Sequence, residues 1–362
     1  MNNLNSLIVA TGSYIPTKVI ENKYFENTDF YDSNSNLFEL DKKEIIKKFE
    51  EITGIKERRY VEDNLNNSDI GYYAAKDAIE SSNIDKETID LIICAHNFGN
   101  VKINNRHIDS VPSIAARIKH LLGIQNPKTI AFDVLFGCPG WLHSMILAHN
   151  YIQSGNAKRV LVVGTETLSR VSDPHDRDSL IYSDGAGATI LEAVESEEKT
   201  GILSYDERSD TINHAHLLRM EKSYNLNYSK DDIFLKMDGH KLYKYALQTV
   251  PELVKNSLIK AKIPLQSIKK VLLHQANLKM DIEILKRLFE LFGITDLLEN
   301  FINKILPMSI SWLGNSSVAT IPTLLDLILK NKLKDQKISK GDIIVFASVG
   351  AGMNVNSMVY KF

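Results

Sequence analysis

The 362-residue sequence contains only two cysteines, Cys94 and Cys138. Two cysteines do not make a disulfide framework, and neither lies in a CxxC pattern, so we expect no structural zinc site and no other bound metal. No run approaches the ~20 apolar residues that a membrane-spanning helix needs. The opening stretch MNNLNSLIVATGSYIP has no basic region and only a short apolar segment, unlike a secretory signal peptide. We therefore expect a cytoplasmic protein without membrane insertion.

The sequence also lacks an excess of charge of either sign. Its 43 Lys and Arg residues are balanced by 45 Asp and Glu, which gives a formal net charge of −2. Nucleic-acid-binding domains usually carry a basic excess, so we expect no nucleic-acid partner. Hydrophobic residues make up 44% and charged residues 24%, as in ordinary globular proteins. A chain of this length exceeds the usual single core, which predicts two domains or one large duplicated domain.

Apolar, β-branched runs alternate with helical patterns along the chain. Continuous apolar strands separated by helices predict an α/β protein with buried parallel sheets and helices on both faces. We expect strands at residues 89–97, 159–166, 269–277 and 342–350. We expect helices at residues 68–82, 109–123, 243–261 and 317–334.

The order of these features repeats. Cys138 and Asn315 each open an apolar helical stretch that leads through a polar turn to a strand, and they are 177 residues apart. Upstream of each lies another strand that ends in a polar motif, IICAHN and VLLHQAN. This parallel order predicts a duplicated unit. We place the two halves at residues 1–195 and 196–362, with the join in the charged stretch 192–204.

The motif FDVLFGCPGW places Cys138 between an apolar run and Pro139. Proline is favoured at the first helical position, so Cys138 is expected at the N-cap of a buried helix. Unpaired N–H groups and the helix dipole at such a position favour a thiolate, which suits a nucleophile. The alternative is a small buried hydrophobic residue, the interpretation that we adopt for Cys94 in its core strand.

Two further motifs favour the catalytic interpretation of Cys138. LLHQAN ends an apolar strand with His274, at the edge where α/β sheets place their chemistry. WLGNSS places Asn315 at a second helix start. Alone, His274 is compatible with a structural histidine and Asn315 with an ordinary N-cap. Together with Cys138, at matching points of a duplicated unit, they predict a convergent site.

Seven motifs together resemble the β-ketoacyl-acyl-carrier-protein synthase III family of the thiolase superfamily, over almost the full chain. They are ATGSYIP, TGIKERR, FDVLFGCPG, DPHDRDSLIYSDGAGATIL, HQANLK, GNSSVATIP and GAGMNVNSMVYKF. The resemblance implies the thiolase-like fold, an α/β architecture of two similar halves in a five-layered αβαβα arrangement. It also implies a homodimer.

The same resemblance implies a mechanism and a set of site residues. Cys138 would carry the acyl group, and His274 and Asn315 would hold the carbonyl of a malonyl-type or β-ketoacyl thioester. The backbone N–H groups of Cys138 and Ala351 would form an oxyanion hole for the acyl-cysteine. Such chemistry combines covalent catalysis with electrostatic stabilisation. It uses acyl and malonyl thioesters as substrates and no cofactor.

The sequence departs from the family pattern where the donor would bind. Arg177 and Lys279 match family positions beside the cofactor and for docking of acyl-carrier protein, although both are also compatible with ordinary solvated charges. Lys48 and Ile52 replace the tryptophan and arginine that clamp the adenine of coenzyme A. Val111 replaces a large aromatic residue that a partner subunit inserts into the acyl pocket. These changes favour carrier-bound donors, medium or long chains, and a specialised member such as the dialkylresorcinol-forming enzymes.

Three other classes of protein are alternatives to a condensing enzyme. A thiolase shares the fold but has a second catalytic cysteine near the C-terminus, where FASVGAGMNVNS has none. A papain-like hydrolase uses Cys, His and Asn in the same chain order, but its cysteine lies near the mature N-terminus. A non-catalytic partner subunit would usually have lost the cysteine or the histidine. The presence of Cys138, His274 and Asn315 together favours the condensing enzyme.

Overall fold

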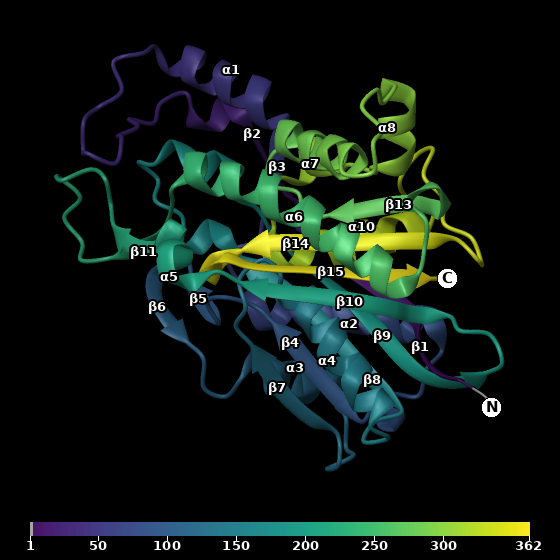
Figure 1. Cartoon of the computed structure of the whole chain (residues 1–362). Coiled ribbons are helices and arrows are strands. Elements are labelled where there is room, and N and C mark those ends of the chain that lie inside the picture. The colour runs from purple at the N-terminus through teal and green to yellow at the C-terminus, as the bar shows by residue number, and fades with distance from the viewer. Residues whose placement is uncertain (1–2) are drawn as a thin grey trace.

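Two mixed β-sheets form the framework of the protein in a computed structural model that describes residues 3–362 (Figure 1). The first sheet has the strand order β1-β9-β8-β4-β7, and the second has the order β10-β15-β14-β13. The strands of the first sheet are β1 (Asn3–Tyr14), β4 (Leu91–Ala95), β7 (Ile130–Val134), β8 (Arg159–Thr167) and β9 (Asp184–Ser196). Those of the second are β10 (Gly201–Ser209), β13 (Ile268–Leu273), β14 (Ile343–Gly350) and β15 (Asn354–Lys361). Residues 1 and 2 of the predicted first half lie outside the described residues.

The two sheets share one pattern of strand directions. In each, two antiparallel pairings are followed by a parallel pairing, β8 with β4 in the first and β14 with β13 in the second. The prediction of wholly parallel sheets is therefore wrong. Only residues 351–353 separate β14 from β15, and so short a connection cannot return the chain for a parallel pairing. The edge strand β7 has no counterpart in the second sheet.

Helices cover both sheets and also lie between them (Figure 1). The outer face of the first sheet carries α2 (Asn67–Ser82) and α3 (Ile114–Leu122). The space between the sheets holds α4 (Gly140–Gln153) and α10 (Thr320–Leu329). The outer side of the second sheet carries α6 (Gly239–Ala261) and, packed on it, α7 (Leu278–Glu290). The result is five layers in the order helix, sheet, helix, sheet, helix.

The central layer explains why α4 is apolar nearly all round. Trp141, Leu142 and Met145 of α4 are buried in one hydrophobic core with Leu324 and Leu325 of α10, together with strand residues from both sheets. Each fully buried aliphatic side chain of this kind contributes ~1.5–3 kcal/mol to folding. This core joins the two sheets and fixes the start of α4, where Cys138 lies.

Shorter elements cover the end of the sheets at which β4, β8, β13 and β14 finish (Figure 1). They are β2 (Lys18–Glu21), α1 (Lys42–Thr53), β3 (Glu57–Tyr60), β5 (Asn100–Lys102), β6 (Asn105–Asp109), α5 (Thr211–His214), β11 (Leu218–Lys222) and β12 (Ile233–Met237). Two short helices, α8 (Glu299–Ile305) and α9 (Ile310–Leu313), follow α7. Within residues 3–362, no helix combines the length and the apolar character needed to cross a lipid bilayer.

Candidate active site

Cys138, His274 and Asn315 line one chamber of about 240 Å³, which we call the inner chamber. His274 directly follows β13, as the sequence predicts, whereas Cys138 directly precedes Pro139, which is the cap of α4. Asn315 lies between α9 and a short 3₁₀ turn at Ser317–Ala319. The rest of the wall is mostly apolar and includes Val349 of β14. The fold thus brings together three residues that are far apart in the sequence.

The turn before Cys138 is pressed against the turn after β14. Gly137 has a φ of 68°, and a Cβ atom added there would meet the backbone nitrogen of Ala351 at 2.6 Å. A Cβ atom added to Gly350 would meet the backbone nitrogen of Cys138, also at 2.6 Å. Only glycine therefore fits at either position. The backbone nitrogens of Cys138 and Ala351 lie on neighbouring turns at the wall of the inner chamber.

The thiol of Cys138 is protonated at neutral pH. Burial raises its pKa to about 11, and a hydrogen bond from the hydroxyl of Ser317, at 3.3 Å, opposes this increase. The sequence predicts a thiolate because of the helix start, and this prediction is wrong for the free chain because desolvation outweighs it. The helix also begins one residue later than predicted, at Gly140 with Pro139 as its cap. Cys94 is fully buried in β4, in agreement with its predicted core position.

His274 is neutral at physiological pH. Its side chain is 5% exposed, and burial lowers its pKa to about 4, against a weaker opposing effect of the Ser317 backbone. A neutral imidazole can donate one hydrogen bond without bringing a buried charge into the chamber. His274 is therefore suited to hold a carbonyl oxygen rather than to form an ion pair with Cys138.

Asn315 is held so that its side-chain NH2 group remains available to donate. Its Oδ1 accepts a hydrogen bond from the backbone N–H of Ser317 at 2.7 Å, and its own backbone pairs with Ile181 and Ser183. The prediction that Asn315 opens the long helix is wrong, because α10 begins at Thr320 after the 3₁₀ turn. Asparagine side chains commonly close such local turns by accepting from the backbone two residues ahead.

Two further groups at the inner chamber are absent from the sequence prediction. The phenol of Tyr182 is buried and has no hydrogen-bond partner within residues 3–362. Asn97, which also lines the chamber, connects Ser317 to the fully buried carboxyl of Glu166 in β8. The one feature of the sequence that could have indicated this contact is Glu166, an acidic residue inside a mostly apolar strand. A buried carboxylate without a partner is costly, so a partner such as Asn97 had to be expected.

A second cavity of about 660 Å³ adjoins the inner chamber and shares walls with it. Lys48, Ile52 and Arg177 line this outer cavity. The guanidinium of Arg177 lies 5.4 Å from the ring centroid of Phe38. Phe38 belongs to the segment that precedes α1. The sequence analysis considered only the positions of Lys48 and Ile52, so it missed an aromatic residue that this other segment supplies to the cavity.

The structure does not bring Lys279 and Val111 to the inner chamber. Lys279 is exposed at the second position of α7, next to Met280 in the shared wall of the two cavities. Val111 is 84% exposed, in the loop between β6 and α3. Within the described chain, no group of three or more His, Cys, Asp or Glu side chains is placed to hold a metal ion.

Sequence comparisons identify relatives along most of the chain. The profile of 3-oxoacyl-[acyl-carrier-protein] synthase III matches residues 132–211, and the profile of its C-terminal part matches residues 258–362. The β-ketoacyl-[acyl-carrier-protein] synthase III of Staphylococcus aureus strain JH1 is 33% identical over 361 residues, which are 99% of each chain.

Solved structures match along nearly the whole chain as well. The 3-oxoacyl-[acyl-carrier-protein] synthase III of Aquifex aeolicus VF5 is 27% identical, with a TM-score of 0.77 over 99% of this chain and 100% of that one. A structure of OleA from Xanthomonas campestris, 19% identical, has a TM-score of 0.73 over 100% of this chain and 99% of that one. The fold is therefore thiolase-like, as predicted.

Proposed function

The chain belongs to the 3-oxoacyl-[acyl-carrier-protein] synthase III family, a family of condensing acyltransferases, and on this premise we propose that it joins two thioesters through an acyl group carried on Cys138. The proposal divides the chain into an N-terminal half, residues 1–195, with the nucleophile, and a C-terminal half, residues 196–362, with His274 and Asn315. The observation that carries it is the position of these three side chains around one buried chamber.

In the first half-reaction, the sulfur of Cys138 attacks the carbonyl carbon of an acyl thioester. The tetrahedral oxyanion accepts hydrogen bonds from the backbone N–H groups of Cys138 and Ala351. The carbon–sulfur bond of the donor then breaks, and the leaving thiolate takes up the proton that Cys138 gives up. The paired turns at Gly137 and Gly350 support this assignment, because they press together the backbones of Cys138 and Ala351, two residues that line the chamber.

In the second half-reaction, His274 and Asn315 donate hydrogen bonds to the thioester carbonyl of a malonyl-type extender. Loss of CO2 leaves an enolate, whose negative oxygen both donors stabilise. The enolate carbon attacks the acyl carbonyl, the bond to Cys138 breaks, and the sulfur is protonated again from solvent. The low pKa of His274 supports a neutral donor in this role. The chain's residues and two thioesters complete this scheme, so the proposal includes no cofactor.

The experiment that tests this function is covalent labelling of the purified protein by an acyl thioester. Intact-protein mass spectrometry should find one acyl group on the wild type and none on Cys138→Ala, while Cys94→Ala should be acylated like the wild type. Full acylation of the Cys138→Ala variant would overturn the proposal.

We further propose that the donor is a medium or long acyl group delivered in the cytoplasm on acyl-carrier protein. Exposed Lys279 beside the chamber wall suits docking of an acidic carrier, whereas Lys48 and Ile52 provide no tryptophan–arginine clamp for adenine. The Arg177–Phe38 pair supplies one stacking surface, so free coenzyme A thioesters should still bind. Their affinity should be lower, by about tenfold or more, than at a site that has the tryptophan–arginine clamp. Acetyl, octanoyl and longer donors, each offered on both carriers, test this preference. Efficient acylation by acetyl-coenzyme A would contradict it.

A second candidate function is the joining of a β-ketoacyl unit to a second acyl chain. The observation that favours it is the unpartnered phenol of Tyr182 at the inner chamber, because a buried O–H is costly unless a substrate oxygen accepts from it. Tyr182→Phe should then slow the use of a 3-oxoacyl thioester and leave the use of the saturated thioester of equal length unchanged. Equal effects on both would remove this candidate.

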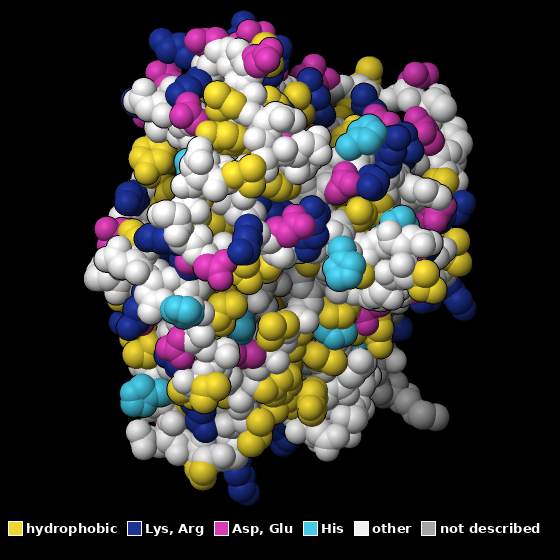
Figure 2. All heavy atoms as spheres, turned by 90° about the vertical axis from the view of Figure 1, so that its left-hand side faces the viewer, with side chains coloured by type: hydrophobic (Ala, Val, Ile, Leu, Met, Phe, Trp, Pro, Cys, Tyr) yellow, Lys and Arg dark blue, Asp and Glu magenta, His cyan; other side chains and the backbone are white. Residues whose placement is uncertain are grey.

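We also propose that the chain forms a homodimer through the β7 edge. The edge of a sheet presents unpaired backbone groups, and Ile130 and Leu135 on or beside β7 are both more than half exposed. Ile108 of β6 and Val111 in the loop that follows β6 are also exposed. Figure 2, which views the side that lies on the left in Figure 1, shows hydrophobic side chains gathered in its lower part. In such a dimer, Val111 would reach the acyl pocket of the partner subunit.

A further inference from the structure

We propose that Glu166, Asn97 and Ser317 form a hydrogen-bond chain that fixes the hydroxyl of Ser317 as a donor to the sulfur of Cys138. The chain makes Ser317 a positioning residue that eases formation of the Cys138 thiolate. The inference rests on the proposed role of Cys138 as the nucleophile. It concerns groups other than the two donors to the extender, His274 and Asn315.

The direction of the chain follows from what each group can donate. The Nδ2 group of Asn97 donates to Oε2 of Glu166 at 2.5 Å, and its second N–H donates to Oγ of Ser317 at 3.1 Å. Because the Ser317 oxygen accepts from Asn97, its own proton is free to point at Sγ of Cys138, 3.3 Å away. A carboxyl group next to Asn97 thus selects the amide orientation in which the NH2 group, not the carbonyl, faces Ser317.

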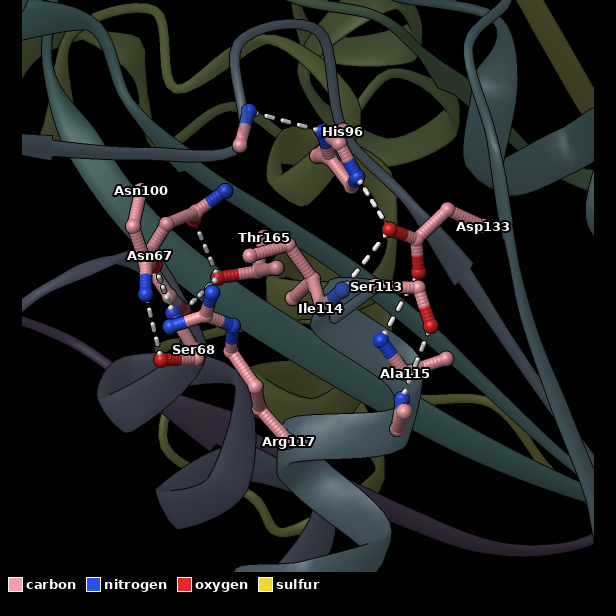
Figure 3. A network of polar contacts seen from close by, with 12 residues as sticks. Asn67, Ser68, His96, Asn100, Ser113, Ile114, Ala115, Arg117, Asp133 and Thr165 are labelled. Carbon is pink, nitrogen blue, oxygen red and sulfur yellow. Dashed lines mark hydrogen bonds and ion pairs between the residues drawn. The ribbon is translucent and has the colours of Figure 1, made fainter. Parts of the chain in front are cut away.

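Asn97 is fixed in place by the residue that precedes it. His96 accepts at Nδ1 from the backbone N–H of Gly99 at 3.0 Å, and its Nε2 lies 2.9 Å from Asp133 (Figure 3). Asp133 in turn accepts from the backbone N–H groups of Ile114 and Ala115, both at 2.7 Å, at the start of α3. The turn after β4 is therefore tied to β7 and α3. The hydrogen bonds of His96 thus hold the backbone of Asn97 at the position from which its side chain reaches both Glu166 and Ser317.

Ser317 has an unusual backbone conformation for its residue type. Its φ is 53°, in the left-handed region that side chains other than glycine, asparagine and aspartate rarely adopt. In this conformation the backbone N–H of Ser317 donates to Asn315 while its hydroxyl donates to Cys138. Strained conformations of this kind persist where the surrounding structure over-determines them, commonly at functional sites. One residue therefore orients both Asn315 and the thiol.

The donor matters because Cys138 lies at the wall of a largely apolar chamber and is only partly exposed. Desolvation raises the pKa of this thiol to about 11 and the charge of Glu166 adds to the increase, so it is the hydroxyl of Ser317, and not the carboxyl behind it, that favours the thiolate. A hydrogen bond to a charged acceptor is stronger than one to a neutral acceptor, so it favours the thiolate over the thiol. Loss of the Ser317 hydroxyl should slow reactions of the thiolate by roughly tenfold to a hundredfold at a given pH.

The test is the pH dependence of Cys138 alkylation by iodoacetamide, measured by peptide mass spectrometry on the purified full chain. Ser317→Ala should lower the rate at pH 8 about tenfold or more and move the midpoint of the profile to higher pH. Ser317→Gly provides a second variant, because glycine adopts a φ of 53° without strain and also lacks the hydroxyl. Ser316→Ala, in the same turn, is the matched control and should leave the profile unchanged.

A double-mutant cycle tests whether Asn97 acts through Ser317. Asn97→Ala should slow alkylation in the wild type and have little further effect in the Ser317→Gly background. A wild-type profile for Ser317→Gly, or an undiminished effect of Asn97→Ala in that background, would overturn the proposal. Alkylation uses no thioester, so its result is independent of whether Cys138 accepts acyl groups.

Discussion

At the scale of single residues, the site keeps its reactive groups neutral until substrate arrives. Burial raises the pKa of Cys138 to about 11 and lowers that of His274 to about 4, so neither carries a charge at pH 7. A thiolate–imidazolium pair is therefore not the ground state. In the proposed mechanism, charge develops only on the sulfur and on substrate oxygens during the reaction, where preorganised donors are most effective.

The separate duties of His274 and Asn315 give the first prediction. Replacing either residue with alanine should cut decarboxylation of a malonyl thioester by roughly 10²-fold or more, the scale of losing one oxyanion donor. Acylation of Cys138 should stay largely intact, because the backbone of Cys138 and Ala351 serves that step. Release of labelled CO2 and intact mass report the two half-reactions. Normal decarboxylation without acylation would mean that the roles are reversed.

The buried imidazole gives a second prediction, on stability. The pKa of His274 falls from 6.5 in the unfolded chain to about 4 in the folded one, so the unfolded state binds more protons between these values. The resulting contribution to stability is complete above pH 6.5 and is lost as the pH falls toward 4. Relative to His274→Gln, the wild type should lose about 2 kcal/mol of unfolding free energy between pH 7 and pH 5. Urea unfolding at both pH values measures this, and equal losses would contradict it.

The three residues around the chamber could be predicted, whereas their supporting groups could not. Cys138, His274 and Asn315 lie in local motifs whose positions relative to strands and helices are visible in the sequence. Glu166 and Asn97 meet Ser317 only after β4, β8 and the turn before α10 have packed together. No local pattern encodes a contact between segments so far apart.

At the scale of elements, the two facing turns at Gly137 and Gly350 give a third prediction. Gly350→Ala introduces a Cβ atom 2.6 Å from the Cys138 nitrogen, so the turns must separate. We expect a loss of ~1–3 kcal/mol in unfolding free energy, as for other overpacked positions, and slower acylation of Cys138. Gly239→Ala is the matched control, because its added Cβ would have no neighbour closer than 3.7 Å. Urea unfolding and timed mass spectrometry measure both effects; unchanged acylation would argue against paired oxyanion donors.

The strands predicted from apolar runs are all present as β4, β8, β13 and β14, and the predicted helices correspond to α2, α3, α6 and α10. The apolar runs in the sequence did not predict the directions of the strands relative to one another. Both β9 and β15 are buried over much of their length, although their sequences are more polar than those of the predicted strands, because they too are covered on both faces. Direction depends on how the chain returns to the sheet, which hydrophobicity does not encode.

At the scale of the whole molecule, the exposed β7 edge gives a fourth prediction. Leu135→Lys places a charge in the proposed interface, where burial without a partner is costly, and should convert the dimer to a monomer. The control is Ile212→Lys, since Ile212 in α5 is 96% exposed and belongs to neither β7 nor the segments beside it in the sequence. Light scattering coupled to size-exclusion chromatography gives the mass of each. A dimeric Leu135→Lys variant, or a monomeric wild type, would remove the proposed interface.

The central layer of helices has a consequence for how the chain is made on the ribosome. The strands of the first sheet and α4 are complete when residue 196 has been added, but α10, the other helix between the sheets, is translated only near the end of the chain. Until then, Trp141 and Met145 of α4 lack the part of their core that α10 and the strands of the second sheet supply. The nascent first half therefore exposes apolar surface that favours aggregation. Cys138 meets His274 and Asn315 only when translation is nearly over.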